Sequence, residues 1–369
     1  MLDEMTVLPK EDPIISTVPR HAILFSILLA YEQSKPWVYN NFIQIHTLKN
    51  LYNAGWRTGA FDFYSDLYGF IQYYQLQTNP WLQMHKLPLD FLQMYEIDIV
   101  NFIKQGIKKN TYFYIEADPV LISVYQRHLT LPRELFIYGY SDKEQCFFFG
   151  DNILDGKYTF QKMSYVELTA GYHSIIEFYK NNSENEKWAT KMKWFLMLEF
   201  TEPIFKRDTI FNNNYLYTSL FTIDPIKISN DINEYLLEDG YALAYRHNPG
   251  YSFGIHCYDE LIKCIEHAKE NCAILDIRAH HFFYSHKKLM LQRLQYLEAL
   301  YPLQTIVPPY QILVTEFERI ISLTVKLNIS RNNTIYDRIV AIYHVCKHME
   351  VDLLRQVVHI LMKNQKALK

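Results

Sequence analysis

The stretch NTYFYIEADPVLISVYQRHLTLPRELFIYGYSDKEQCFFFGDNILDGKYTF, residues 110–160, decides the fold of this chain. Two runs within it, Thr111–Ala117 and Leu135–Tyr140, are dense in Tyr, Phe and Ile, which suit a pleated and half-buried surface. Shorter runs at Gln145–Phe149 and Tyr158–Phe160 follow across polar breaks of the kind that form antiparallel hairpin turns. The stretch therefore predicts a small antiparallel sheet.

Helical patterns flank this predicted sheet. The apolar run Ala22–Ala30 predicts a buried helix with Ser16 or Thr17 as its N-cap. Leu87–Lys108 has the spacing of an amphipathic helix, and Trp37–Tyr52 is similarly helical and aromatic in character. The remaining predicted elements are helices at Tyr165–Tyr179, Asp224–Leu237, 257–270, 276–300, 309–328 and 335–362, with strand-like runs at Lys193–Phe200 and Tyr215–Ile223.

The order of these elements predicts two domains. A chain of 369 residues is longer than most single domains. Its character changes after Ser164 from mixed helix and sheet to mainly helix, and Asn181–Glu186 reads as a polar linker. We therefore predict an α+β protein, with helices and an antiparallel sheet over residues 1–170 and a mainly helical domain with a few strands over residues 171–369.

Composition excludes several classes of function. The formal net charge of -3 gives no basic field of the kind that favours nucleic acid or a membrane surface. The five cysteines are an odd number without framework-like spacing, which favours a reducing compartment. The first residues are acidic where a signal peptide is basic, and the run Ala22–Ala30 is shorter than the roughly 20 residues that span a bilayer. We expect a cytoplasmic protein with no nucleic-acid or membrane partner.

Three segments together resemble a known family. They are HAILFSILLA at residues 21–30, the run from Thr111 to Asn152 within the opening stretch, and DIRAHHFFYSHKKLM at residues 276–290. With them the chain resembles the bacterial proteins related to butirosin biosynthesis protein H. The resemblance implies an N-terminal domain similar to papain-like cysteine peptidases and a place in nonribosomal peptide or other carrier-protein pathways. It also implies transfer of an acyl group from a carrier-protein thioester to an amine.

The chain departs from the residues that this resemblance implies. Papain-like folds place a thiol at the start of the first helix, a His at the start of a central strand, and an Asp or Asn on the next strand. Here Arg20, His21 and Ala22 stand at the thiol position and Arg133 stands at the His position, while Asp151 keeps its type. Arginine cannot act as a general base, because its pKa lies above 12. The scaffold is therefore expected without its usual thiol mechanism.

Four candidate catalytic residues remain, namely His21, His128, Glu134 and Asp151, and Arg133 is a candidate substrate-binding residue at an altered pocket mouth. Each has an alternative structural interpretation. His21 is equally suited to the surface at a helix start, Arg133 and Glu134 to a solvated strand edge, and Asp151 to a turn. Cys146 lies within an aromatic strand and is expected to be a small buried hydrophobe.

Two clusters in the C-terminal half invite a ligand interpretation. Cys257, Cys264 and His267 fall on one helical face, but they lack the short ligand separations of zinc sites, so we expect core packing and no metal. Arg278 and His281 could form a cationic wall that faces a phosphopantetheine or a carboxylate, and the alternative is a solvated helix face.

Two hypotheses of function follow. In the first, the protein is an accessory module of natural-product biosynthesis that binds an acyl or peptidyl carrier protein, or the intermediate that it carries, without catalysis. In the second, it is an amide-forming acyltransferase that positions an amine or peptide intermediate against the thioester with one proton acceptor. Neither requires a cofactor beyond the phosphopantetheine of the partner carrier protein. Loss of both the thiol and the base favours the first hypothesis.

Overall fold

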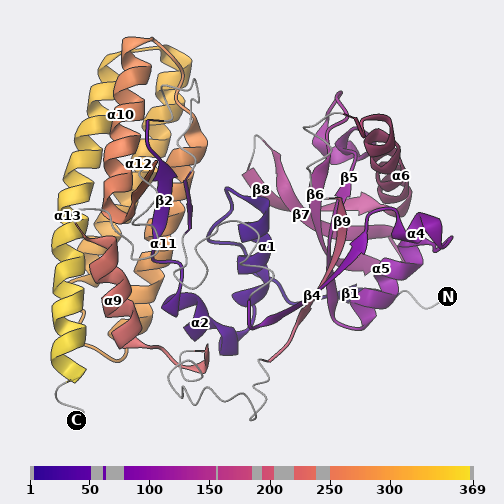
Figure 1. The fold of residues 1–369 in the computed structure, drawn as a ribbon, viewed down its shortest axis with the longest axis horizontal. Helices are drawn as coiled ribbons and strands as arrows, with labels where there is room; N and C mark the ends of the chain where they lie inside the picture. The colour runs from indigo at the N-terminus through magenta and orange to yellow at the C-terminus, as the bar shows by residue number, and fades with distance from the viewer. Residues whose placement is uncertain are drawn as a thin grey trace. The chain divides into compact units, whose positions relative to one another are not determined.

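The computed structural model of the chain describes residues 4–50, 61–63, 79–154, 157–184, 193–202, 220–237 and 250–365. The chain forms two compact units, and both are discontinuous in sequence. The first unit consists of residues 1–32 and 75–206, and the second of residues 33–74 and 207–369. Antiparallel sheet is concentrated in the first unit and long helices in the second, which confirms the predicted α+β class (Figure 1).

An antiparallel sheet forms the centre of the first unit. Its strands follow the order β4-β9-β5-β6-β7-β8, and β1 pairs with the far half of β6. The strands are β1 (Met5–Val7), β4 (Leu82–Pro88), β5 (Thr111–Ala117), β6 (Arg133–Ser141), β7 (Cys146–Leu154), β8 (Lys157–Ser164) and β9 (Trp194–Phe200). The predicted strands at β5 to β8 are confirmed, and those from β6 onward are longer than their aromatic runs.

Helices cover both faces of this sheet, so all residues of β5 are buried (Figure 1). The helix α1 (Pro19–Leu28) packs against β7 on one face. On the other face α5 (Ile99–Lys108) and α6 (Tyr165–Asn181) pack against β5. Three short helical segments, α4 (Phe91–Met94), η3 (Pro119–Leu121) and η4 (Ser123–Tyr125), complete the described part of the unit.

Two local predictions in the N-terminal half differ from the structure, the first wholly and the second in part. The N-cap of α1 is Val18, with no side-chain hydrogen bond, rather than Ser16 or Thr17. The predicted helix Leu87–Lys108 begins as the end of β4, because Leu82–Pro88 pairs along its whole length with β9. The rest of the predicted range is helical in two pieces, α4 and α5, and the Asp98 carboxylate caps α5 by accepting the Asn101 N–H at 2.6 Å.

The predicted helix Trp37–Tyr52 is also mostly wrong. The structure has η1 (Glu32–Ser34), α2 (Lys35–Asn40) and then the strand β2 (Ile45–Leu48). Phe42 adopts a positive φ of 59°, which a continuing right-handed helix cannot contain. Residues 215–219 of the predicted strand Tyr215–Ile223 lie outside the described residues, and residues 220–221 are helical.

Long helices form the second unit, as the sequence predicts for the C-terminal half. They are α9 (Pro225–Tyr235), α10 (Cys257–Glu270), α11 (Ile277–Glu298), α12 (Val307–Ser330) and α13 (Thr334–Gln365). A small sheet of order β10-β2-β3 joins them, with β3 at Phe61–Phe63, β10 at Tyr251–Phe253 and the short turn η6 (Gly254–His256) after it. None of the helices within the described ranges is both long enough and apolar enough to cross a membrane.

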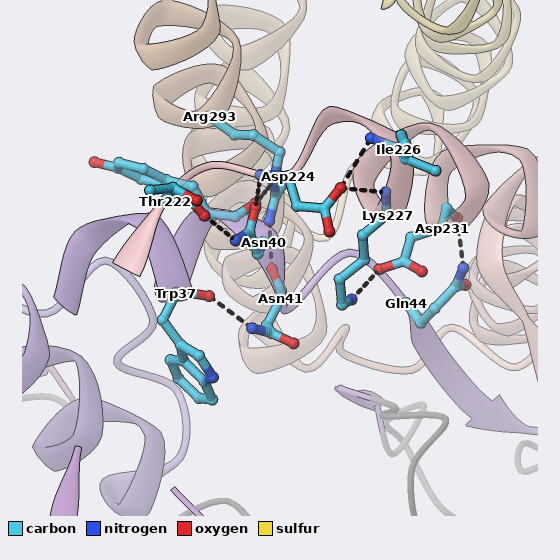
Figure 2. Close-up of polar contacts among 11 residues, drawn as sticks. Trp37, Asn40, Asn41, Gln44, Thr222, Asp224, Ile226, Lys227, Asp231 and Arg293 are labelled. Carbon is cyan, nitrogen blue, oxygen red and sulfur yellow. Dashed lines mark hydrogen bonds and ion pairs between the residues drawn. The ribbon is translucent and has the colours of Figure 1, made fainter. Parts of the chain in front are cut away.

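Hydrogen bonds hold the end of α2 to the start of α9 and to α11 (Figure 2). The Asn40 amide donates to the Thr222 carbonyl at 2.8 Å, and its oxygen accepts the Asp224 N–H at 2.7 Å. The buried Arg293 of α11 donates to the carbonyl oxygens of Tyr39 and Asn41. These bonds explain why residues from the N-terminal half belong to the helical unit.

The units therefore do not divide where the sequence predicts, near residue 170. That residue lies inside α6, which runs from Tyr165 to Asn181. The strand β9 follows it and pairs between β4 and β5, so the first unit needs residues far beyond 170. Long-range strand pairing, which leaves no local composition signal, causes the difference.

Candidate functional site

The predicted site residues Arg133 and Glu134 lie on opposite faces of the sheet. Arg133 pairs with Ala117 and Glu134 with Glu116 across β5 and β6. A Cβ built on Gly171 of α6 would lie 3.4 Å from that of Ala117, so the Ala117 and Arg133 positions face α6. Successive strand residues point to opposite faces. Glu134 therefore faces the side of the sheet on which α1 packs.

On the α6 face, Arg133 is bound to Asp151 of β7. The Arg133 Nε and Nη2 atoms donate to Asp151 Oδ2 at 3.0 and 2.7 Å, and Nη2 also donates to the Asn152 carbonyl at 2.9 Å. The Tyr125 hydroxyl of η4 donates to the same carboxylate oxygen at 2.7 Å. The Asp151 carboxylate is fully buried, whereas the Arg133 side chain is 32% exposed.

The electrostatics of this group fit a fixed ion pair rather than a proton acceptor. Burial acts to lower the pKa of Arg133, but Asp151 and Tyr125 together raise it above its usual value. Burial and the Asp151 charge hold the pKa of Tyr125 well above its usual value. Both groups therefore stay protonated at neutral pH, and Asp151 orients an arginine where the resemblance implies a histidine.

On the α1 face, Glu134 lies directly opposite Glu116. Like charges at directly opposite strand positions destabilise a sheet unless other groups compensate. The Tyr179 hydroxyl donates to Glu116 Oε2 at 2.9 Å. The buried Tyr114 hydroxyl lies beside Glu134 without a hydrogen bond of normal geometry, and burial followed by the Glu134 charge raises its pKa well above its usual value. Arg20 of α1 supplies a nearby positive charge.

The two candidate histidines are placed differently from each other. His21 lies in the first turn of α1 and is only 3% exposed, so the surface interpretation of it is wrong. His128 is exposed in the segment between η4 and β6. Asp151, by contrast, is buried on the α6 face. The structure therefore joins Arg133 with Asp151, and it does not gather the candidate residues into one pocket.

Of the three residues Cys257, Cys264 and His267, only Cys257 lies in the core, while the other two are half-buried. Cys257 is fully buried, and its thiol lies 3.5 Å from the Ser252 carbonyl as a weak donor. Cys146 is also buried, as predicted, and burial raises its pKa. No group of three or more His, Cys, Asp or Glu residues in the described part of the chain is arranged to hold a metal ion.

The predicted cationic wall on α11 carries less charge than its residues suggest. The Arg278 side chain is bound to Asp276, the N-cap of its own helix, through both Nε and Nη2. His281 is half-buried, and burial lowers its pKa below the usual value, so it is neutral at neutral pH. Both residues belong to the second unit, whereas Arg133 and Glu134 belong to the first.

Sequence reasoning missed Tyr125 and Glu116. Tyr125 carries no signal, because its contact with Asp151 depends on how the segment after β5 folds. Glu116 does carry one, since it is the only charged residue in the otherwise apolar run of β5. A buried acid in a strand is costly without partners, so the position is a candidate functional one.

A search against protein-family models finds no match for this chain, and a search of curated proteins finds none either.

Proposed function

We propose that the protein is a binding module of nonribosomal peptide or related natural-product biosynthesis. It keeps the papain-like scaffold that its sequence resembles, and it binds an acyl or peptidyl carrier protein, or the intermediate that the carrier holds, without a covalent step of its own. The phosphopantetheine arm comes from the carrier protein, and the module acts in the bacterial cytoplasm.

The observation that carries this proposal is the Arg133–Asp151 ion pair. It stands where the resemblance implies a catalytic His–Asp pair, and its Asp151 oxygen already accepts bonds from Arg133 and Tyr125. A guanidinium that is permanently protonated and that donates two hydrogen bonds to one carboxylate oxygen cannot take a proton from a nucleophile. Covalent acyl transfer needs a nucleophile and a base within hydrogen-bond reach.

A second candidate function, the amide-forming acyltransferase, is supported by Glu134. Its carboxylate faces α1 beside Glu116 and the buried Tyr114 hydroxyl. Direct attack of a bound amine on a thioester needs positioning and one proton acceptor, and a carboxylate can serve as that acceptor. The two functions differ in whether thioester is consumed.

A single assay separates the two functions. The full chain is mixed with carrier proteins bearing acetyl or aminoacyl thioesters and with a primary amine, while anisotropy reports binding and mass spectrometry reports thioester loss. We expect saturable binding, no loss of thioester beyond that of the carrier alone, and no mass adduct on the chain. Absence of binding to every loaded carrier would exclude the module.

Substitutions of two glutamates test whether any thioester turnover depends on Glu134. Turnover that Glu134→Gln abolishes would replace the binding module with the acyltransferase. The matched control is Glu144→Gln, because Glu144 is an exposed carboxylate in the turn between β6 and β7 that pairs with Lys162 of β8. Turnover lost equally in both variants would reflect a general charge effect and would leave Glu134 without a catalytic role.

A further inference from the structure

A closed polar centre lies inside the helical unit. Lys287 of α11 and Glu350 of α13 form an ion pair with a Nζ–Oε2 distance of 2.8 Å, and both side chains are fully buried. Burying two charges costs several kcal/mol per ion unless further hydrogen bonds satisfy the remaining atoms. The pair is therefore expected to have further hydrogen-bond partners on both the ammonium and the carboxylate.

The three N–H donors of the Lys287 ammonium are all used. They reach Glu350 Oε2 at 2.8 Å, the Tyr235 hydroxyl at 2.8 Å and His286 Nδ1 at 3.1 Å. Since the ammonium can only donate, His286 Nδ1 must be unprotonated and accept. The other ring nitrogen, Nε2, lies 2.9 Å from the Ile43 carbonyl oxygen, to which it must donate.

Three tyrosine hydroxyls surround the carboxylate side of the centre. The Tyr258 hydroxyl donates to Glu350 Oε2 at 2.6 Å, the Tyr310 hydroxyl to Oε1 at 2.7 Å, and Tyr235 approaches Oε2 at 3.3 Å. The helices α9, α10, α11, α12 and α13 each contribute at least one of these groups. At the His286 ring, an additional proton on Nδ1 cannot be taken up without breaking the contact to Lys287.

We propose that His286 is a proton switch that holds the segment leading into β2 against α11. Its neutral ring joins the Lys287 ammonium on one side to the Ile43 carbonyl on the other. Uptake of one proton at Nδ1 turns the acceptor into a donor that faces an ammonium group 3.1 Å away. The ring must then leave, and the Ile43 contact to α11 is lost with it.

The groups around His286 reinforce the direction of this switch. The cations nearest to it are Lys287 and Arg293 on its own helix. The titratable groups from the other described elements are Tyr39 on α2, Asp231 and Tyr235 on α9, Cys257 and Tyr258 on α10, Tyr310 on α12, and Cys346 and Glu350 on α13. Burial and then the Lys287 charge lower the pKa of His286 well below its usual value. Burial raises the pKa of the tyrosines and cysteines, so they stay neutral.

The sign of the pH dependence follows from that direction. The open state takes up a proton near the usual histidine pKa of about 6.5, whereas the closed state resists it. The opening constant is therefore flat above this pH and rises about tenfold for each pH unit below it, until the closed-state pKa is reached.

Hydrogen exchange of the full chain tests the switch. Amides of β2 are compared at about pH 7.5 and about pH 5.5 after correction for intrinsic exchange, and the wild-type opening constant should rise about tenfold. In His286→Asn the side-chain amide oxygen can still accept from Lys287 but does not titrate. The ratio of the β2 opening constants at the two pH values should therefore fall to about one. The control is His280→Asn, because His280 is also buried in α11 but bonds Tyr343 instead, and its β2 response should match wild type.

Two outcomes would overturn the proposal. One is a wild-type β2 opening constant that is about the same at both pH values. The other is a tenfold rise of that constant at the lower pH that persists in His286→Asn. If that variant does not fold, imidazole ¹⁵N shifts of the wild type decide instead. We expect His286 to stay unprotonated at Nδ1 for as long as β2 is protected, and a doubly protonated ring with β2 still protected would contradict the switch.

Discussion

Arg133 contributes to the stability of the fold through its ion pair with the buried Asp151 carboxylate. In Arg133→Ala the buried Asp151 would keep only Tyr125 as a partner for Oδ2. Removing one partner of a fully buried pair costs about 3–5 kcal/mol, and since Arg133 is 32% exposed we expect about 2 kcal/mol of lost unfolding free energy. Urea denaturation measures it.

The comparison for Arg133 is the exposed pair Lys162–Glu144. Both of its side chains are about half exposed, so Lys162→Ala should change the unfolding free energy by less than about 1 kcal/mol. Equal effects of the two substitutions would show that Asp151 does not depend on Arg133.

Tyr158 offers the opposite case, a hydroxyl that can be removed at little cost. The hydroxyl is buried in contact with the Gly150 position, and it lies beside the Ser26 hydroxyl without a hydrogen bond of normal geometry. Tyr158→Phe should therefore lie within about 0.5 kcal/mol of wild type or be stabilising. A loss above about 1.5 kcal/mol would mean that the hydroxyl has a strong partner, such as a buried water.

Gly150 is constrained by the same hydroxyl. A Cβ at Gly150 would lie 2.5 Å from it, so Gly150→Ala should cost about 1–3 kcal/mol of unfolding free energy. Combining it with Tyr158→Phe should recover at least about 0.5 kcal/mol of that loss, since the closest clash is gone. A strictly additive double mutant would contradict the predicted clash.

Among the elements, α6 and α1 differ in how their first turns are satisfied. Ser164 and Glu167 form a reciprocal capping box at the start of α6, whereas α1 begins at Val18 with no side-chain cap. Ser164→Ala should therefore cost about 1 kcal/mol in thermal or urea unfolding. Thr17→Ala, at a position that sequence reasoning favours as a cap, should stay within about 0.5 kcal/mol.

Strands and helices with strong local signals could be predicted from the sequence. The aromatic runs of β5 and β6 and the long apolar periods of α12 and α13 are decided within each segment. The run at Leu87 could not be predicted, because its strand character depends on β9, more than a hundred residues later. Segments with competing local and distant partners are where sequence reasoning fails.

The candidate site was predictable only in part. Asp151 keeps the type that the resemblance implies, and Arg133 at the expected His position contacts it, since the start of β6 lies beside the later part of the antiparallel strand β7. That Arg133 and Glu134 cannot share a pocket was already implied by the two-residue period of a strand. The positions of His21 and His128 depend on packing and on a loop, which the sequence does not encode locally.

At the scale of the whole molecule, the Lys287–Glu350 pair joins helices from distant parts of the chain. Lys287→Met alone leaves a buried carboxylate without its cation and should cost about 3–5 kcal/mol of unfolding free energy. In the double variant Lys287→Met with Glu350→Leu, no charge is left unpaired, and the loss should be smaller by at least about 1 kcal/mol. A double variant that unfolds more readily than either single variant would contradict this account.

The discontinuity of the two units sets the order in which the chain can fold during its synthesis. The first unit lacks a central strand until β9 has been made, so its sheet cannot close before about residue 200 leaves the ribosome. Residues 33–74 are made early but belong with helices that come last. Residues 75–206 of the first unit are synthesised before the rest of the second unit, with which residues 33–74 pack. A nascent chain stalled between the two units therefore exposes β2 without β10, and this is the stage at which a chaperone would be needed most.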